Sequence, residues 1–197
     1  MKKYYPVFLD VSKKNVLVIG GGTVALRKIL SLLKCGASVS VASIKFHPRI
    51  LALEAKGKIV IHKKKFSPEQ LNHKNLVFCA TDNHELNQKV AQVCFERGLW
   101  VNVVDNPSLC SFIVPSTVNR GEVVFAISTG GASPALAKYL RKKIEKSFGK
   151  EVGILSQLLK EQRSQLLEMS LNKRRRVLKE FLNEKFLKEI KRKTIKR

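Results

Sequence analysis

Short apolar runs alternate with helical patterns over residues 1–112. The apolar runs are typical of buried strands and cover Asn15–Ile19, Ser38–Ala42, Lys58–His62, Leu76–Ala80 and Trp100–Val104. The helical patterns between them cover Thr23–Lys34, Pro48–Gly57 and Asn83–Arg97. Strands that alternate with helices over such short connections predict an α/β domain built on a parallel, doubly wound sheet.

The pattern changes after residue 112. Short strands with antiparallel character are predicted at Phe112–Pro115, Ser116–Asn119 and Val123–Ser128, followed by a helix over Ala135–Ser147. From residue 150 onward no strand pattern occurs, and leucines at helical spacing predict two or three helices. We therefore expect a small α+β segment at 113–147 and a helical domain at 148–197.

The first apolar run ends in a glycine motif. Gly20, Gly22 and Ala25 form the pattern G-x-G-x-x-A between the predicted strand and helix. In this context Gly20 allows the tight turn, Gly22 lets a pyrophosphate approach the backbone, and the helix N-terminus attracts the phosphates. The motif predicts that residues 1–112 form a Rossmann-like dinucleotide-binding domain, with a merely tight strand–helix turn as the alternative.

The charge and the cysteine content limit the kinds of partner and site that the chain can have. The net charge is +23, and residues 136–197 carry 20 Lys or Arg against 7 Asp or Glu. Such a charge indicates a polyanionic partner or a compositional bias of the genome. The charge runs lack interleaved aromatic residues, which argues against nucleic acid as the partner. The four cysteines form no C-x-x-C pair, so neither a disulfide framework nor a metal site is predicted.

The chain contains no apolar stretch of transmembrane length, so no membrane association is expected. The first residues, Met-Lys-Lys-Tyr-Tyr-Pro, contain no apolar run of signal-peptide length. These two features predict a cytoplasmic protein.

Four further motifs point to a family. Residues 4–10 read Tyr-Tyr-Pro-Val-Phe-Leu-Asp, and residues 79–82 read Cys-Ala-Thr-Asp. Residues 102–115 begin Asn-Val-Val-Asp-Asn-Pro, and residues 126–134 contain Ser-Thr-Gly-Gly. From Tyr5 to Ile144 the chain resembles the precorrin-2 dehydrogenase / sirohydrochlorin ferrochelatase family, which also forms the N-terminal module of siroheme synthase.

The resemblance implies an NAD-dependent oxidation of precorrin-2, a tetrapyrrole with eight carboxylates, to sirohydrochlorin. It also implies a homodimer formed through residues 113–147. Some family members insert a metal ion as well, and the sequence leaves that activity open, as it does the choice between the siroheme and cobalamin pathways.

The resemblance also assigns site residues. Asp105 falls on the functional aspartate of the family. The cofactor contacts fall on Gly20, Gly21, Gly22, Thr23, Val24, Ile44 and Lys45. We expect Ser128, Thr129 and Arg120 to contact the substrate. Thr129 stands where the family has serine.

Several alternatives stay open. Asp105 is either a general base or a residue that orders the Asn106-Pro107 turn. Asp82 is interpreted as a helix cap, and Lys28 as part of a solvated helix face. Lys45 leaves NADP possible beside NAD, since no acidic residue follows the second strand. A basic nucleic-acid-binding protein and a nucleotide sensor without turnover are the competing functions.

Overall fold

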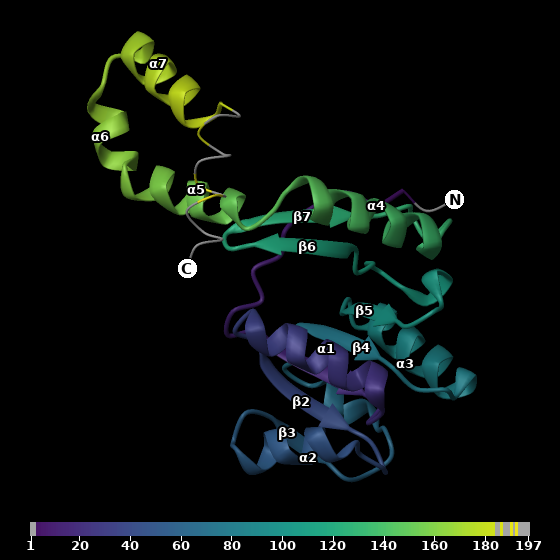
Figure 1. Ribbon diagram of the computed structural model, residues 1–197. Helices are drawn as coiled ribbons and strands as arrows, with labels where there is room; N and C mark the ends of the chain where they lie inside the picture. The colour runs from purple at the N-terminus through teal and green to yellow at the C-terminus, as the bar shows by residue number, and fades with distance from the viewer. Residues whose placement is uncertain (1–2, 184–185, 187–189, 191, 193–197) are drawn as a thin grey trace. The chain divides into compact units, whose positions relative to one another are not determined.

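The computed structural model describes residues 3–183, 186, 190 and 192. It divides into two compact units, Met1–Val114 and Pro115–Arg197. The first unit contains β1 (Asn15–Ile19), α1 (Thr23–Lys34), β2 (Ser38–Ala42), α2 (Pro48–Ala55), β3 (Val60–His62), the 3₁₀ turn η1 (Pro68–Leu71), β4 (Leu76–Cys79), α3 (His84–Glu96), β5 (Trp100–Val103) and the 3₁₀ turn η2 (Pro107–Leu109) (Figure 1).

The five strands of this unit form one parallel sheet in the order β3-β2-β1-β4-β5. Side chains alternate across it, as the period of a strand requires. Val16 and Val18 pack with α1 and α2 on one face, whereas Leu17 and Ile19 pack with α3 on the other. The predicted doubly wound fold is therefore confirmed.

The direction of winding reverses between β1 and β4. The chain first builds outward from β1 to β2 and β3, and then resumes on the other side of β1 with β4 and β5. In open α/β sheets, ligands bind outside the carboxyl ends of the strands at such a switch point. The loops that follow β1, β4 and β5 are thus the ones that can form a site.

The second unit contains β6 (Ser116–Arg120), β7 (Val123–Ile127), α4 (Pro134–Ser147), α5 (Glu151–Glu161), α6 (Arg163–Glu168) and α7 (Leu171–Phe181) (Figure 1). β6 and β7 form an antiparallel pair. α5 comes so close to the β6–β7 turn that a Cβ on Gly153 would lie 2.6 Å from the Arg120 carbonyl oxygen. Glycine at position 153 therefore permits this packing.

Two predicted elements differ from the structure. Residues Phe112–Pro115 form no strand. The Phe112 ring instead packs at 5.5 Å from the Phe78 ring, and Pro115 has no N–H to donate to a ladder. β3 is shorter than predicted, since Lys58 and Ile59 are not paired. Two or three helices were predicted after residue 150, and the described residues form three, α5 to α7. Residues 193–197 are not among the described residues.

Candidate functional site

The glycine motif forms the loop between β1 and α1. Gly20 has φ +119°, and a Cβ there would overlap the Ala80 carbonyl oxygen. This conformation and close approach require glycine. A Cβ on Gly22, by contrast, would meet nothing within 4 Å. The space in front of Gly22 is therefore open to a ligand, while Gly20 closes the turn behind it.

Gly22 is also the N-cap of α1 and offers no side chain to the first turn. The first turn contains no acidic residue that could neutralise it. The N–H groups of Thr23, Val24 and Ala25 lie in the first turn of α1, and this end of the helix carries a partial positive charge. The loop thus has the donors and the empty space that a dinucleotide pyrophosphate needs, so the residues present fit this cofactor.

The loop after β2 is tied to the glycine loop. The His47 N–H donates to the Gly21 carbonyl at 2.7 Å, and the Ser43 hydroxyl donates to the Lys45 carbonyl at 2.8 Å. A Cβ on Gly21 would overlap that same Lys45 carbonyl oxygen. The structure therefore brings Ile44 and Lys45, both predicted cofactor contacts, next to the predicted phosphate loop. The Ile44 side chain is exposed there.

Asp105 follows β5 and has a left-handed backbone, with φ +59°. Its side chain is exposed at the carboxyl end of the sheet. A left-handed non-glycine residue costs free energy, and such residues cluster at functional sites. The neighbouring turn is held by Cys110, whose thiol accepts from the Val103 N–H at 3.1 Å and donates to the Asn106 carbonyl at 3.2 Å.

The loop after β4 is fixed by a buried amide. Asn87 accepts from the Thr81 hydroxyl at 2.6 Å and from the Cys79 thiol at 3.0 Å, and it donates to the Thr81 carbonyl at 3.0 Å. The side chain that caps α3 is Asn83, which accepts from the Leu86 N–H at 2.9 Å. The prediction that Asp82 caps this helix is therefore wrong, because the cap lies one residue later.

Two buried cysteines of this unit have unreactive thiols. Burial raises the pKa of Cys79 to about 12 and that of Cys94 to about 11. Both thiols therefore stay protonated at neutral pH, whereas a nucleophile or a metal ligand would need the thiolate.

Lys28 lies where α1 passes Phe78, and it is half-buried rather than solvated as predicted. Its ammonium is 5.9 Å from the centre of the Phe78 ring. Position 28 comes three residues after buried Ala25 and four before buried Leu32. Residues at these spacings share one helix face, and this was the sequence signal that could have placed Lys28 toward the sheet.

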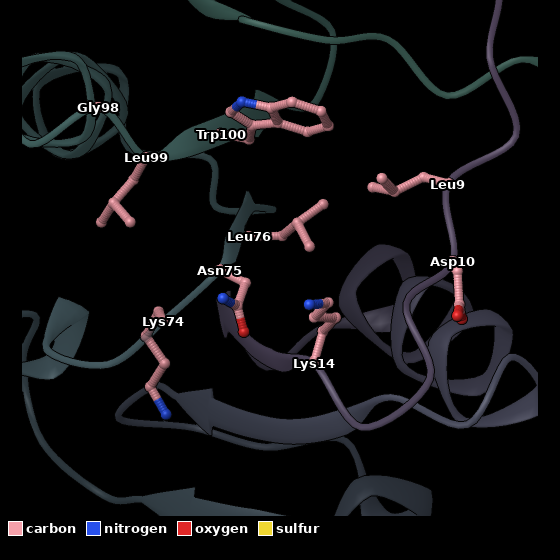
Figure 2. Close-up of a pocket in the computed structure, with 9 residues that line it drawn as sticks. All are labelled: Leu9, Asp10, Lys14, Lys74, Asn75, Leu76, Gly98, Leu99 and Trp100. Atoms are coloured by element: carbon pink, nitrogen blue, oxygen red, sulfur yellow. The ribbon is translucent and has the colours of Figure 1, made fainter.

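A cavity of about 290 Å³ in the first unit is not at this edge of the sheet. It lies where the strands begin, and Figure 2 shows Lys14, Asn75 and Trp100 around it. The Lys74 ammonium, which also lines it, donates to the Ser40 hydroxyl at 2.9 Å. Because the glycine loop and Asp105 follow the carboxyl ends of the strands, this cavity plays no part in the predicted site.

The predicted substrate residues all lie in the second unit. The Thr129 hydroxyl accepts from the Ser133 N–H and donates to the Ser133 carbonyl, both at 3.1 Å. The Ser128 hydroxyl accepts from the Gly130 N–H at 3.1 Å. Ser128 is exposed, in a turn that leads directly into the N-terminus of α4.

The side chain of Arg120 binds the C-terminal end of α4. Its guanidinium donates to the carbonyls of Phe148 at 2.7 Å, Glu145 at 3.0 Å and Asn119 at 3.0 Å. The bonds to Glu145 and Phe148 satisfy carbonyls at the end of the helix, whereas Asn119 is the neighbouring residue in β6. Arg120 therefore has a structural role in its unit, and a contact with substrate stays a prediction.

Among residues 3–183 and the other described positions, no group of three or more His, Cys, Asp or Glu could hold a metal ion. Over the same described residues, no helix has the length and apolar character to cross a membrane.

The fold and the glycine loop define a dinucleotide-binding protein of the Rossmann type. Residues 7–116 match the family model described as "Putative NAD(P)-binding", and residues 126–147 match the model described as "Sirohaem biosynthesis protein central". The chain thus belongs to the precorrin-2 dehydrogenase / sirohydrochlorin ferrochelatase family, as its motifs predicted.

Individual relatives agree with this assignment. Siroheme synthase of Mannheimia succiniciproducens is 37% identical over 98% of this chain and 41% of that protein. Siroheme synthase of Nitrosococcus oceani is 40% identical over 83% of this chain and 35% of that protein. The chain therefore spans less than half the length of these relatives. The solved structure of SirC, a precorrin-2 dehydrogenase, is 28% identical, with a TM-score of 0.80 over 98% of this chain and 100% of that chain.

Proposed function

We propose that this chain oxidises precorrin-2 to sirohydrochlorin with NAD as the cofactor. SirC, whose whole length the chain covers, is named a precorrin-2 dehydrogenase, and the curated relatives are siroheme synthases. The oxidation removes a hydride and a proton from the tetrapyrrole. When bound, the nicotinamide supplies the hydride acceptor.

The residues of the β1–α1 loop hold the cofactor in this proposal. Gly20 shapes the turn, Gly21 and Gly22 present backbone to the pyrophosphate, and Thr23 and Val24 contribute N–H groups of the first helical turn. Ile44 and Lys45, fixed against Gly21, border the adenosine end. Lys45 offers a positive charge to a 2′-phosphate, and titration with NAD and NADP separately decides the preference.

Asp105 accepts the proton in this proposal. A carboxylate oxygen of Asp105 takes the proton that the substrate loses as the hydride departs. β1 and β5 are two strand spacings apart in the sheet, about 10 Å. Asp105 therefore lies at the same edge of the sheet as the glycine loop, two strands away from it.

The placement of Asp105 carries the proposal. It is an exposed carboxylate on a left-handed backbone at the carboxyl edge of the sheet. An anaerobic assay tests the function: purified chain and NAD should convert precorrin-2 to sirohydrochlorin, followed by its absorbance. Addition of Fe²⁺ or Co²⁺ to the product then tests metal insertion. Absence of oxidation with both NAD and NADP would overturn the proposal.

The second unit supports a homodimer. The β6–β7 pair needs packing against other elements, because two strands alone are only marginally stable, yet no residue of α4 is buried. Leu136, Tyr139 and Leu140 of α4 are exposed, as is Val124 of β7. We therefore propose that residues 113–147 pair with the same segment of a second copy, which would cover these side chains. A cytoplasmic location stays a prediction.

A further inference from the structure

Lys28 is an ammonium for which the described part of the chain provides no counter-charge at contact distance. No ion pair or hydrogen bond of its ammonium occurs among the described residues. Its contact is with the Phe78 ring, at 5.9 Å from the centroid. Phe78 in turn packs edge-on against Phe112 at 5.5 Å. An apolar, half-enclosed environment of this kind disfavours a charge unless something else compensates it.

The electrostatic neighbours of Lys28 lie at the proposed active edge. Burial lowers the pKa of Lys28, the charge of Arg27 lowers it further, and the charge of Asp105 opposes this by raising it. Phe78, over which the ammonium lies, is paired with Asn102 of β5, three residues before Asp105. The ammonium thus lies over β4, beside the strand that leads into the proposed base.

Lys28 is displaced from the phosphate end of this site. It lies five residues into the helix from Thr23, about 7.5 Å along the axis at the rise of an α-helix. It also lies on the helix face that meets β4, as its contact with Phe78 shows. The Cα of Lys28 is therefore set back from the phosphate loop, and the NAD comparison below separates an anion of the substrate from the pyrophosphate.

We propose that Lys28 binds one carboxylate of the tetrapyrrole and so holds the reacting carbon next to Asp105. This assignment rests on the proposed function, which supplies a substrate with eight carboxylates. A charge-assisted bond to the substrate would give this half-buried ammonium an ion-pair partner, which it lacks among the described residues.

The test uses Lys28→Met, which keeps the apolar stem and removes the charge. Binding of sirohydrochlorin, measured by absorbance titration, should weaken by about 10- to 100-fold, the equivalent of one hydrogen bond to a charged group. The KM for precorrin-2 should rise similarly with a smaller change in kcat. Lys28→Arg should restore most of the affinity. Lys34→Met, which removes an exposed charge from the same helix, is the matched control and should bind normally.

Two readouts separate this role from others. A lysine whose pKa is lower in the folded protein opposes folding while it is protonated, so Lys28→Met should raise the melting temperature of the free protein. A purely structural lysine would lower it. The NAD-dependent rise in melting temperature should be unchanged, and its loss would assign Lys28 to the cofactor and overturn the inference.

Unchanged sirohydrochlorin binding by Lys28→Met would also overturn the inference. If wild-type protein binds sirohydrochlorin but does not oxidise precorrin-2, the proposed function fails while the binding comparison still decides the role of Lys28.

Discussion

Adjacent glycines in the β1–α1 loop should respond to substitution in opposite ways. In Gly22→Val the new side chain enters open space, since nothing lies within 4 Å of its Cβ. The fold should lose only about 1 kcal/mol, the cost of a poorer N-cap. The side chain would nevertheless fill the space that the pyrophosphate needs, so NAD binding should be abolished.

Gly21→Ala is the matched comparison. Its Cβ would overlap the Lys45 carbonyl oxygen and lie 3.0 Å from the Lys45 carbonyl carbon. Backbone atoms cannot move away cheaply, so the free energy of unfolding should fall by roughly 1–3 kcal/mol. For a chain of this size each kcal/mol changes the melting temperature by about 2–4 °C.

Thermal-shift titration measures both effects. With NAD at about 100 times its Kd, wild-type protein should gain about 2.7 kcal/mol, or roughly 5–11 °C. Gly22→Val should show almost no rise with NAD and a nearly normal melting temperature without it. Gly21→Ala should melt at a lower temperature without ligand. A full NAD-dependent rise in Gly22→Val would refute the assignment of this loop to the cofactor.

Three other substitutions test separate parts of the structure. Asn87→Ala removes a buried acceptor of the Thr81 hydroxyl and should cost about 1–3 kcal/mol in chemical denaturation; an unchanged midpoint would contradict its role in fixing the β4 loop. Arg120→Met removes two bonds to carbonyls at the end of α4 and should lower the free energy of unfolding by about 1–3 kcal/mol; a loss of substrate affinity with normal stability would show a binding role instead. Tyr139→Glu places a charge on the exposed face of α4, and light scattering should then report monomers where the wild type forms dimers; a wild-type monomer would disprove the proposed pairing.

The sheet and the glycine loop were predictable because their signals are local. Each strand of the sheet is short and rich in apolar residues, and Gly20 stands where the first strand meets a helical pattern. The bounds of β1, α1 and β2 agree with the prediction residue for residue. Strand β3 was overestimated because its pairing with β2, rather than its composition, decides where it begins.

The site was less predictable because its contacts are distant in sequence. The role of Gly21 depends on Lys45, and that of Lys28 on Phe78 and Asp105. The sequence around Arg120 gives no sign of its partners, because the carbonyls that it binds come from residues up to 28 positions away. The left-handed backbone of Asp105 likewise follows from the turn after β5, and the composition of the chain does not indicate it.

Turnover by Asp105→Asn tests the central claim most directly. The substitution keeps the size and turn-forming ability of the side chain but removes its capacity to accept a proton. Under anaerobic conditions with NAD, the rate of precorrin-2 oxidation should fall by about 10²–10⁴-fold, while the NAD-dependent rise in melting temperature stays normal. A rate close to that of the wild type would show that Asp105 only orders its turn and would contradict its role as the base.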